Sequence, residues 1–428
     1  MLLKLDLSKY LYLFFIVLML FTNLLKPIIV SVILIIYFVF RIWRYKKFSF
    51  NQILIYLIFE SVPLSFFSIL GYTTDIFPIS WFHLLIILHF FILLFSTKLR
   101  KTTFILFFLF SMYNFLYLFE NISFISGLKQ LFVIILFLII FFITDGIEKK
   151  SIKSLNFIDL ENIYILGTLA IAIQVILQYI FYNYYSIQLG YLTLMGSNRL
   201  ALGATMGDFS FTSIYIGTGI ALMIINFFES NIAISKIIFF VPIMLLGLVT
   251  TTARTGLYSL VLVLILYYLF NLRTLNWRSF FSILITPVLF VRIFEIVLLK
   301  RGKQSLLSSS GRVQNYIDAL QIFSSNPKNI LVGIGLGKEE IISRGLSFIP
   351  HNFIIQFLLQ LGILGLIFIF LVFLNYYYYD FSHSGIIKWI ILYIVISSMF
   401  VPDIFSSRFL SVVLVLATIE KCKGYNYE

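Results

Sequence analysis

Long apolar segments recur along almost the whole chain, and they restrict the fold more than any other feature of the sequence. Apolar runs of about 15 to 22 residues alternate with short polar stretches, as helices that cross a hydrocarbon layer about 30 Å thick require. Of the 428 residues, 61% are hydrophobic and only 11% are charged, a balance that no water-soluble core of this size needs. The sequence therefore predicts an all-α, polytopic integral membrane protein.

The candidate spans define about 12 to 14 transmembrane segments. They lie near residues 10–25, 27–41, 52–71, 80–96, 103–119, 128–144, 161–182, 210–228, 234–252, 256–270, 279–298, 352–375, 386–401 and 404–420. The first two and the last two are separated so briefly that each pair could form a re-entrant hairpin. The first segment lacks a small-residue cleavage site, so we expect it to be retained. We expect one transmembrane domain over residues 1–428, with one long extracytoplasmic loop at 299–350.

Lysine and arginine gather in alternate loops, which sets the expected orientation because short basic loops stay in the cytoplasm. The clusters are Lys4 and Lys9; Arg41, Arg44, Lys46 and Lys47; Lys98, Arg100 and Lys101; Lys149, Lys150 and Lys153; Arg273 and Arg278; and Lys421 and Lys423. Both termini are therefore expected in the cytoplasm. The formal net charge of +13 largely reflects this topology, so we expect no nucleic-acid partner. The single cysteine, Cys422, excludes an internal disulfide.

A few polar side chains fall inside the predicted spans, where an unpaired charge is costly. Arg292 and Glu295 lie three residues apart on one helix and are expected to pair. Glu60, His83 and His89 have no partner that is evident from the sequence.

Basic residues are sparse in the short loops of the opposite face, which makes the exceptions informative. They are Lys26, Arg199, Arg254 and Arg408, and the long loop adds Arg312. Arginine can bind phosphate oxygens with two donors at once, so several converging arginines would suit a pyrophosphate in a single outer pocket. The alternative is that each arginine extends to the lipid headgroups.

The long loop contains a predicted amphipathic helix that begins near Arg312, after the hydroxyl caps of 308–310. Its apolar residues recur with helical spacing at Val313, Tyr316, Ile317, Leu320 and Phe323, and we expect this stripe to pack on the bundle. Asn326-Pro327 ends it. The run Gly333-Ile334-Gly335-Leu336-Gly337 follows. It lacks the strand and helix of a dinucleotide-binding motif, but its backbone N–H groups could cradle an anion; a plain turn is the alternative.

Several motifs follow one another in the second half of the chain. They are Ala253-Arg254-Thr255-Gly256, Ser310-Gly311-Arg312, Asn326-Pro327, the glycine run, and Pro350-His351-Asn352-Phe353 leading into Gln360-Leu361-Gly362-Ile363-Leu364-Gly365. In order and spacing, this set resembles the C-terminal half of the bacterial O-antigen polymerases and ligases, membrane glycosyltransferases that act on polyprenyl-pyrophosphate-linked glycans. Arg199, followed by Gly203 and Asp208, is similar to the arginine segment that precedes it. The resemblance covers about residues 195–370.

One pattern departs from the family. Some polymerases carry an arginine followed by a glycine after ten intervening residues, but here the corresponding positions hold Ser210 after Arg199 and Phe323 after Arg312. This departure concerns the subfamily rather than the chemistry.

The resemblance implies a GT-C-like fold in the bacterial plasma (inner) membrane, with an active site on the extracytoplasmic face. It implies an O-antigen or capsule polymerase that transfers a growing glycan from polyprenyl pyrophosphate to a lipid-linked repeat unit. The modest outer loop favours a polymerase over the first alternative, an O-antigen ligase with lipid A-core or another acceptor. A lipid-linked oligosaccharide flippase is a second alternative, but it should bury polar groups near the midplane. Expected partners are the lipid-linked oligosaccharide, membrane lipids and, for a polymerase, a chain-length regulator.

The residues allow this chemistry without a metal ion or other cofactor. The acidic residues of the outer face are scattered rather than clustered: Asp75, Glu120, Asp208, Asp318, Glu339, Glu340 and Asp403. We therefore expect arginines to replace a metal ion. His351 is the candidate general base because the pKa of imidazole is about 6.5; a helix cap or a cationic phosphate ligand are its alternatives. The predicted catalytic residues are His351, Arg254 and Arg312, and the predicted substrate-binding residues are Arg199, Asn352, Asp208 and Gly335.

Overall fold

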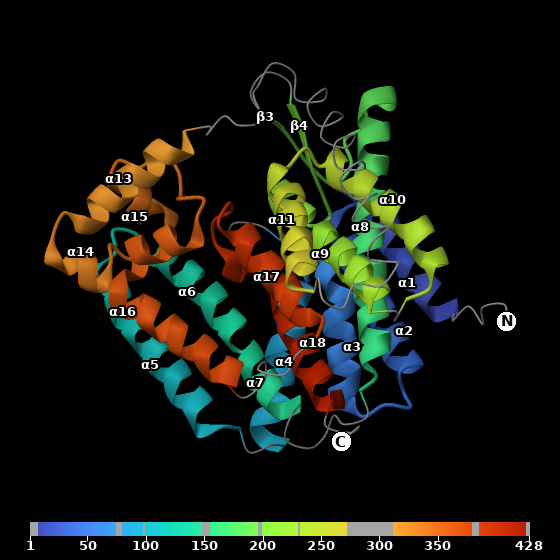
Figure 1. Cartoon of the computed structure of the whole chain (residues 1–428), viewed down its shortest axis with the longest axis horizontal. Helices are drawn as coiled ribbons and strands as arrows, with labels where there is room; N and C mark the ends of the chain where they lie inside the picture. Colours follow the sequence, from blue (N-terminus) through green and yellow to red (C-terminus); the bar gives the residue numbers. More distant parts are fainter. Residues whose placement is uncertain are drawn as a thin grey trace. The chain divides into compact units, whose positions relative to one another are not determined.

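The computed structural model describes residues 7–73, 79–96, 99–147, 155–195, 199–229, 232–271, 311–378 and 385–424. Helices dominate this part of the chain (Figure 1). Six of the described helices are long and apolar enough to cross a membrane, and six further apolar helices are shorter. The predicted all-α, polytopic membrane bundle is therefore confirmed. The predicted span at 279–298, with Arg292 and Glu295, lies outside the described residues.

The chain forms two compact units. Unit 1 contains Met1–Leu85, Asn156–Leu306 and Ile386–Ile394, and unit 2 contains Ile86–Leu155, Leu307–Gly385 and Val395–Glu428. The helices of unit 1 are α1 (Leu7–Leu18), η1 (Met19–Leu24), α2 (Pro27–Arg44), α3 (Phe50–Ser61), η2 (Val62–Leu64), α8 (Phe157–Tyr185), α9 (Phe209–Phe228), α10 (Ile234–Thr250) and α11 (Arg254–Phe270). Those of unit 2 are α5 (Lys101–Tyr117), η3 (Leu118–Glu120), α6 (Phe124–Leu138), α7 (Ile140–Gly146), α13 (Arg312–Ser324), α14 (Pro327–Val332), α15 (Lys338–Ser343), α16 (Phe353–Tyr376), η7 (Ile404–Ser406) and α18 (Arg408–Gly424). Two helices, α4 (Trp81–Ser96) and α17 (Ile387–Ser398), are divided between the units.

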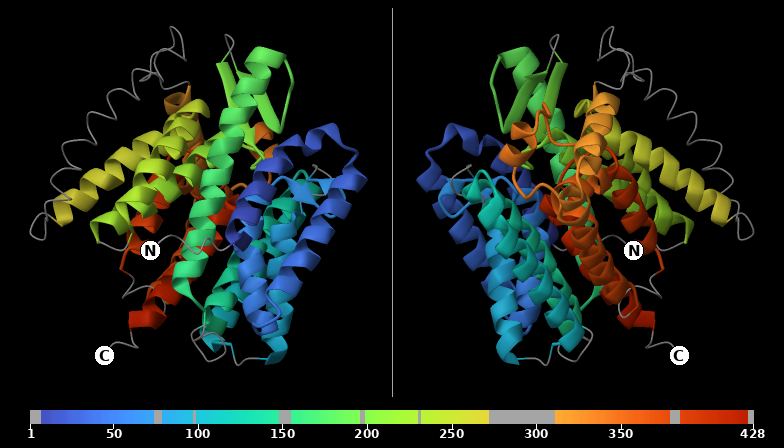
Figure 2. Two further views of the ribbon diagram at one scale, coloured as in Figure 1. Left: turned by 90° about the vertical axis from the view of Figure 1, so that its right-hand side faces the viewer. Right: turned by 90° about the vertical axis from the view of Figure 1, so that its left-hand side faces the viewer.

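Unit 1 also contains two small antiparallel hairpins that the sequence did not predict. The first pairs β1 (Phe67–Ser68) with β2 (Gly71–Tyr72), and the second pairs β3 (Tyr191–Met195) with β4 (Arg199–Ala204). The second hairpin lies at the C-terminal end of α8 (Figure 2). Gln178 of α8 holds it there, because its side-chain amide donates to the carbonyls of Leu189 and Tyr191.

The long helix α8 is the centre of unit 1, and it packs against α1, α3, α9 and α10. These helices approach one another at small residues. A Cβ atom added to Gly219 of α9 would lie 2.1 Å from Thr168 Oγ1, and one added to Gly247 of α10 would lie 2.6 Å from Ala172 Cβ. Close backbone approach at glycine and alanine is the usual way in which membrane helices gain packing energy.

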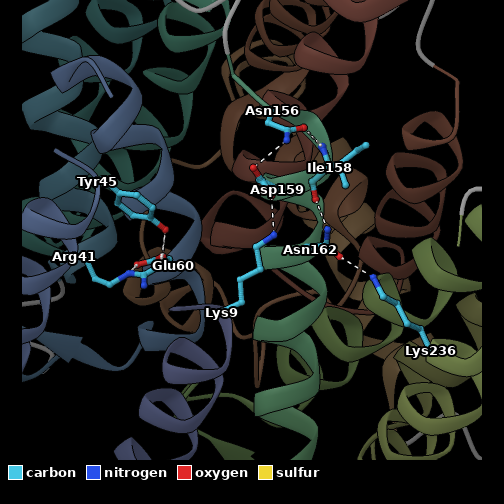
Figure 3. A network of polar contacts seen from close by, with 9 residues as sticks. All are labelled: Lys9, Arg41, Tyr45, Glu60, Asn156, Ile158, Asp159, Asn162 and Lys236. Atoms are coloured by element: carbon cyan, nitrogen blue, oxygen red, sulfur yellow. Dashed lines mark hydrogen bonds and ion pairs between the residues drawn. The ribbon is translucent and has the colours of Figure 1, made fainter. Parts of the chain in front are cut away.

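A buried ion pair joins α2 to α3 and gives Glu60 the partner that the sequence did not reveal. The Arg41 guanidinium contacts both carboxylate oxygens of Glu60, and Tyr37 and Tyr45 donate hydrogen bonds to them, as Figure 3 shows in part. The side chains of Arg41 and Glu60 are only 2% and 0% exposed. A carboxylate with three donors is stable in such surroundings because each charge is paired and hydrogen-bonded.

Unit 2 is organised around a break in α16 at Gly362. Gly362 has φ 64° and ψ −170°, so the helix stops and restarts there. Helix α5 runs beside α16, and α13 and α14 pack on it (Figure 1). The three carbonyls just before the break accept hydrogen bonds from outside the helix: Leu359 from Ile334 N (2.8 Å), Gln360 from Gly335 N (3.1 Å) and Leu361 from Tyr113 Oη (3.1 Å).

The amphipathic helix predicted at Arg312 is confirmed as α13, which ends at Ser324. Its predicted hydroxyl caps at 308–310 lie outside the described residues. Ala319 joins a small core cluster, and Phe323 packs against it. The expected packing of the stripe on the bundle holds only in part, because Val313, Ile317 and Leu320 remain 56%, 44% and 43% exposed.

The Arg41–Glu60 pair predicts an asymmetry between single and double variants. Glu60→Leu leaves a buried guanidinium without its carboxylate, so we expect the free energy of unfolding to fall by about 3 kcal/mol or more. The double variant Arg41→Met/Glu60→Leu removes both charges and should recover most of this loss. The measurement is the thermal unfolding midpoint of the purified protein in detergent. A single variant as stable as the wild type would show that the pair is not a structural link.

Candidate functional site

In unit 1, Arg199 braces the turn that leads into α11. Its Nε donates to Thr252 Oγ1 (3.2 Å) and its Nη2 donates to Thr252 O (2.7 Å). Thr252 lies in the left-handed region with φ 60°, a conformation that costs a branched residue energy and persists only when the surroundings enforce it. The guanidinium carbon of Arg199 also lies 5.3 Å from the centroid of the Phe209 ring. Arg199 therefore fixes the path of the backbone just before Arg254.

Arg254 is the first residue of α11, and the first turn of this helix is held against α9 and α17. A Cβ atom added to Gly256 would lie 2.4 Å from Ser213 O, so only glycine allows this approach. Tyr393 Oη donates to Gly256 O (3.0 Å). Two of the predicted arginines, Arg199 and Arg254, are thus associated with one rigid turn of unit 1.

The third predicted residue of unit 1, Asp208, is the N-cap of α9. Its Oδ1 accepts hydrogen bonds from Ser210 N (2.7 Å) and Phe211 N (2.9 Å). These bonds satisfy backbone donors that the first turn of a helix leaves unpaired. Burial raises the pKa of Asp208. The capping role explains this side chain without a substrate, and its predicted substrate contact stays a prediction.

In unit 2, His351 lies just before α16 and is held from two sides. Tyr316 of α13 donates to His351 O (2.8 Å), and the backbone of Phe400 lies beside the imidazole. Burial and the neighbouring Arg312 guanidinium lower the pKa of His351 to about 4. The imidazole is therefore neutral at pH 7. A neutral imidazole keeps a lone pair on one ring nitrogen, as a general base requires.

Asn352 is the N-cap of α16. Its Oδ1 accepts from Ile354 N (3.0 Å) and Ile355 N (3.2 Å), and its Nδ2 lies 3.7 Å from Met399 Sδ. The side chain thus links the start of α16 to the loop at 399–403. This position explains why an asparagine follows the histidine, and a substrate contact by Asn352 stays a prediction.

The glycine run has a clear packing role. Four of its five backbone N–H groups form hydrogen bonds: Gly333 N bonds to Asn329 O, Ile334 N and Gly335 N bond to carbonyls of α16, and Gly337 N donates to Gln130 Oε1 (2.7 Å). Space is also limited, because a Cβ atom added to Gly335, at φ 106°, would lie 2.2 Å from Asn121 Oδ1. These contacts explain the glycines, and a substrate contact by Gly335 stays a prediction.

Asp403, which the sequence indicated only as one of several scattered acidic residues, has an unusual environment in the structure. Its Oδ1 is buried and accepts no hydrogen bond within the described part of the chain. Its backbone is left-handed, with φ 53°, and burial raises the pKa of its carboxyl group to about 6. Strain and an unsatisfied polar atom at one position are typical of functional sites. The only sequence signal is the dipeptide Pro402-Asp403 between two apolar runs.

Comparison with known families agrees with the motif resemblance. A model described as O-antigen ligase matches residues 239–370. The matched segment contains Arg254, Arg312, Gly335, His351 and Asn352, whereas Arg199 and Asp208 precede it. No curated protein sequence matches the chain. The six long apolar helices and this similarity to O-antigen ligases both indicate an integral membrane protein.

The electrostatic link between Arg312 and His351 predicts a shift in titration. Arg312→Gln removes the positive charge, so the pKa of His351 should rise from about 4 toward the ordinary value of about 6.5. Diethyl pyrocarbonate modifies only neutral imidazole. The pH at which His351 becomes half-reactive, followed by mass spectrometry of its peptide, should therefore increase. Arg344→Gln, which removes an exposed arginine of the same unit, is the control and should leave this pH unchanged.

The structural role of the glycine run predicts a contrast between two alanine variants. Gly335→Ala places a methyl group against Asn121 and should lower the thermal midpoint, with loss of activity as the start of α16 shifts. Gly345→Ala has a similar left-handed backbone, with φ 93°, but nothing lies within 4 Å of its added Cβ. The Gly345→Ala variant therefore shows the effect of backbone strain alone, a loss of about 1 kcal/mol in the free energy of unfolding. Equal midpoints for the two variants would argue against close packing at Gly335.

Proposed function

We propose that this protein is a metal-independent glycan polymerase of the plasma membrane. It transfers a growing O-antigen or capsule glycan from polyprenyl pyrophosphate to a lipid-linked repeat unit at the extracytoplasmic face, with both termini in the cytoplasm. The observation that carries the proposal is the neutral, oriented imidazole of His351 next to the Arg312 guanidinium, within an O-antigen ligase domain. A base and an adjacent cation are what this transfer needs from a protein.

The reaction joins an acceptor hydroxyl oxygen to the anomeric carbon of the donor sugar and breaks the bond from that carbon to the pyrophosphate. The hydroxyl proton goes to the unprotonated ring nitrogen of His351. The leaving pyrophosphate takes the electron pair of the broken bond. Because pyrophosphate is already a good leaving group, the protein needs only to position the acceptor, take its proton and stabilise the new negative charge.

The arginines supply the positive charge in this proposal. Arg312 is assigned to the pyrophosphate because it lies near the base in unit 2. Arg254, whose backbone is fixed by the turn in unit 1, is proposed as a further catalytic cation. Arg199 already donates to Thr252, so we assign it mainly to holding that turn. Within the described residues, no three ligating side chains gather in a way that could hold a metal ion.

A ligase is the second candidate. The matching family model is itself described as O-antigen ligase, and a ligase would use the same base and cations with a different acceptor, such as lipid A-core. The two activities differ only in that acceptor.

The test is a transfer assay with purified protein in detergent. Lipid-pyrophosphate-linked repeat units are supplied with EDTA and without added metal, and the products are separated by size. We expect a ladder of lengthening glycans that His351→Ala or Arg254→Ala lowers at least 100-fold, in line with the loss of a general base or of transition-state charge stabilisation.

The matched control is His89→Leu. His89 is buried in α4 and neither ring nitrogen has a hydrogen-bond partner in the described structure, so this change should leave the ladder intact. A ladder that persists in His351→Ala would contradict the assigned base. In a parallel assay with lipid A-core as the second acceptor, transfer only to lipid A-core would identify a ligase, and no transfer to either acceptor would favour a flippase.

A further inference from the structure

The side chain of Gln356 connects two segments of unit 2 that lie far apart in the sequence. Gln356 is on the first turn of α16 and is fully buried. Its Oε1 accepts from Asp403 N (2.7 Å), and its Nε2 donates to Gln360 Oε1 (3.1 Å). Both ends of the amide are therefore occupied, and one of them holds the backbone of the loop at 399–403.

The same loop lies beside the candidate base. The Phe400 backbone is next to the imidazole of His351, and Met399 Sδ accepts a hydrogen bond of 3.7 Å from the side-chain amide of Asn352. Three side chains at or near the start of α16, those of His351, Asn352 and Gln356, thus contact the loop at 399–403. Of the three, only the Gln356 bond joins a fully buried side chain to the loop backbone.

We propose that Gln356 is a positioning residue for His351. It fixes the loop at 399–403 so that the Phe400 carbonyl accepts the imidazole N–H, which leaves the opposite ring nitrogen unprotonated and correctly oriented. A hydrogen bond to one ring nitrogen commonly sets the tautomer and the orientation of a functional histidine, and so determines which nitrogen can act. This inference rests on the proposed function, in which that nitrogen is the base.

The other end of Gln356 belongs to a network that makes its position rigid. Gln360 and Gln130 of α6 exchange two hydrogen bonds of 2.9 Å, and Gln130 Oε1 also accepts from Gly337 N. Gln356 is thereby tied through Gln360 to α6 and to the end of the glycine run. Buried amides that are fully paired in this way specify one arrangement of side chains.

Two substitutions separate the parts of this role. Gln356→Met keeps the length of the side chain and removes both hydrogen bonds. A displacement of about 1 Å at a reacting group can cost on the order of 100-fold in rate, so we expect kcat to fall 10- to 100-fold. KM for the lipid-linked glycan should stay within about twofold, because Gln356 does not contact substrate. Gln356→Glu keeps an acceptor for Asp403 N–H and should restore most of kcat.

A second readout does not depend on the reaction. In Gln356→Met, His351 is released from the Phe400 carbonyl, so its rate of modification by diethyl pyrocarbonate at pH 7 should rise severalfold. Gln356→Glu should return that rate to the wild-type value. The rate is measured on the peptide that contains His351.

Gln52→Met is the matched control for a purely structural glutamine. Gln52 is also buried, and its Oε1 accepts from Ser49 N in the capping box of α3 in unit 1. Its loss should lower the thermal midpoint but leave kcat and the modification of His351 unchanged.

Two results separate this inference from the proposed function. If Gln356→Met behaves as Gln52→Met does, with wild-type kcat per folded protein and wild-type modification of His351, Gln356 is only structural and the inference is overturned. If the wild type transfers no glycan, the proposed function fails. The modification rates then still decide whether Gln356 holds His351 in place.

Discussion

Hydrogen bonding of the carbonyls at the break in α16 determines the structure of unit 2. A helix that stops at Gly362 cannot give the carbonyls of residues 359–361 their usual partners four residues ahead, and an unpaired carbonyl in an apolar environment costs several kcal/mol. The glycine run and Tyr113 supply the missing donors. Glycine is required on both sides, because Cβ atoms on Gly333 and Gly362 would each lie 2.4 Å from the opposing backbone. The short helical segment that follows His351 is thus anchored at its far end by backbone bonds rather than by lipid.

The sequence predicted the features that depend on local periodicity and failed where a partner lies far along the chain. Apolar runs and the helical spacing after Arg312 revealed the spans and α13, because each helix satisfies its own backbone. The β3–β4 hairpin was missed because its register is held by Gln178 on the preceding helix. Glu60 could not be paired with Arg41 for the same reason. In both cases, no pattern in the sequence between the two partners indicates that they form a contact.

In the candidate site, too, the sequence indicated residue types but not the contacts between residues that are far apart in the chain. Residue types, their order and the family resemblance led us to propose His351 and the arginines, because a metal-free transfer would need a base and cations. Their individual roles depend on contacts that spacing does not encode. Arg199 interacts with Thr252, 53 residues away, and Gly335 N bonds to a carbonyl at the break in α16. Asp403 and Gln356 were not selected because single acids and amides beside apolar runs are common, and only the folded chain brings them into one hydrogen bond.

The charge of the substrate would complete the electrostatics of the base. In the structure, burial and the neighbouring Arg312 keep the pKa of His351 at about 4, which makes it a weak base. A bound pyrophosphate would place negative charge beside Arg312 and reduce its effect on the imidazole, so the pKa of His351 would rise toward neutrality. Catalysis by a general base is most efficient when its pKa lies near the working pH. The donor would therefore strengthen the base only when it occupies the site, and an acceptor hydroxyl or water alone would meet a poor proton acceptor.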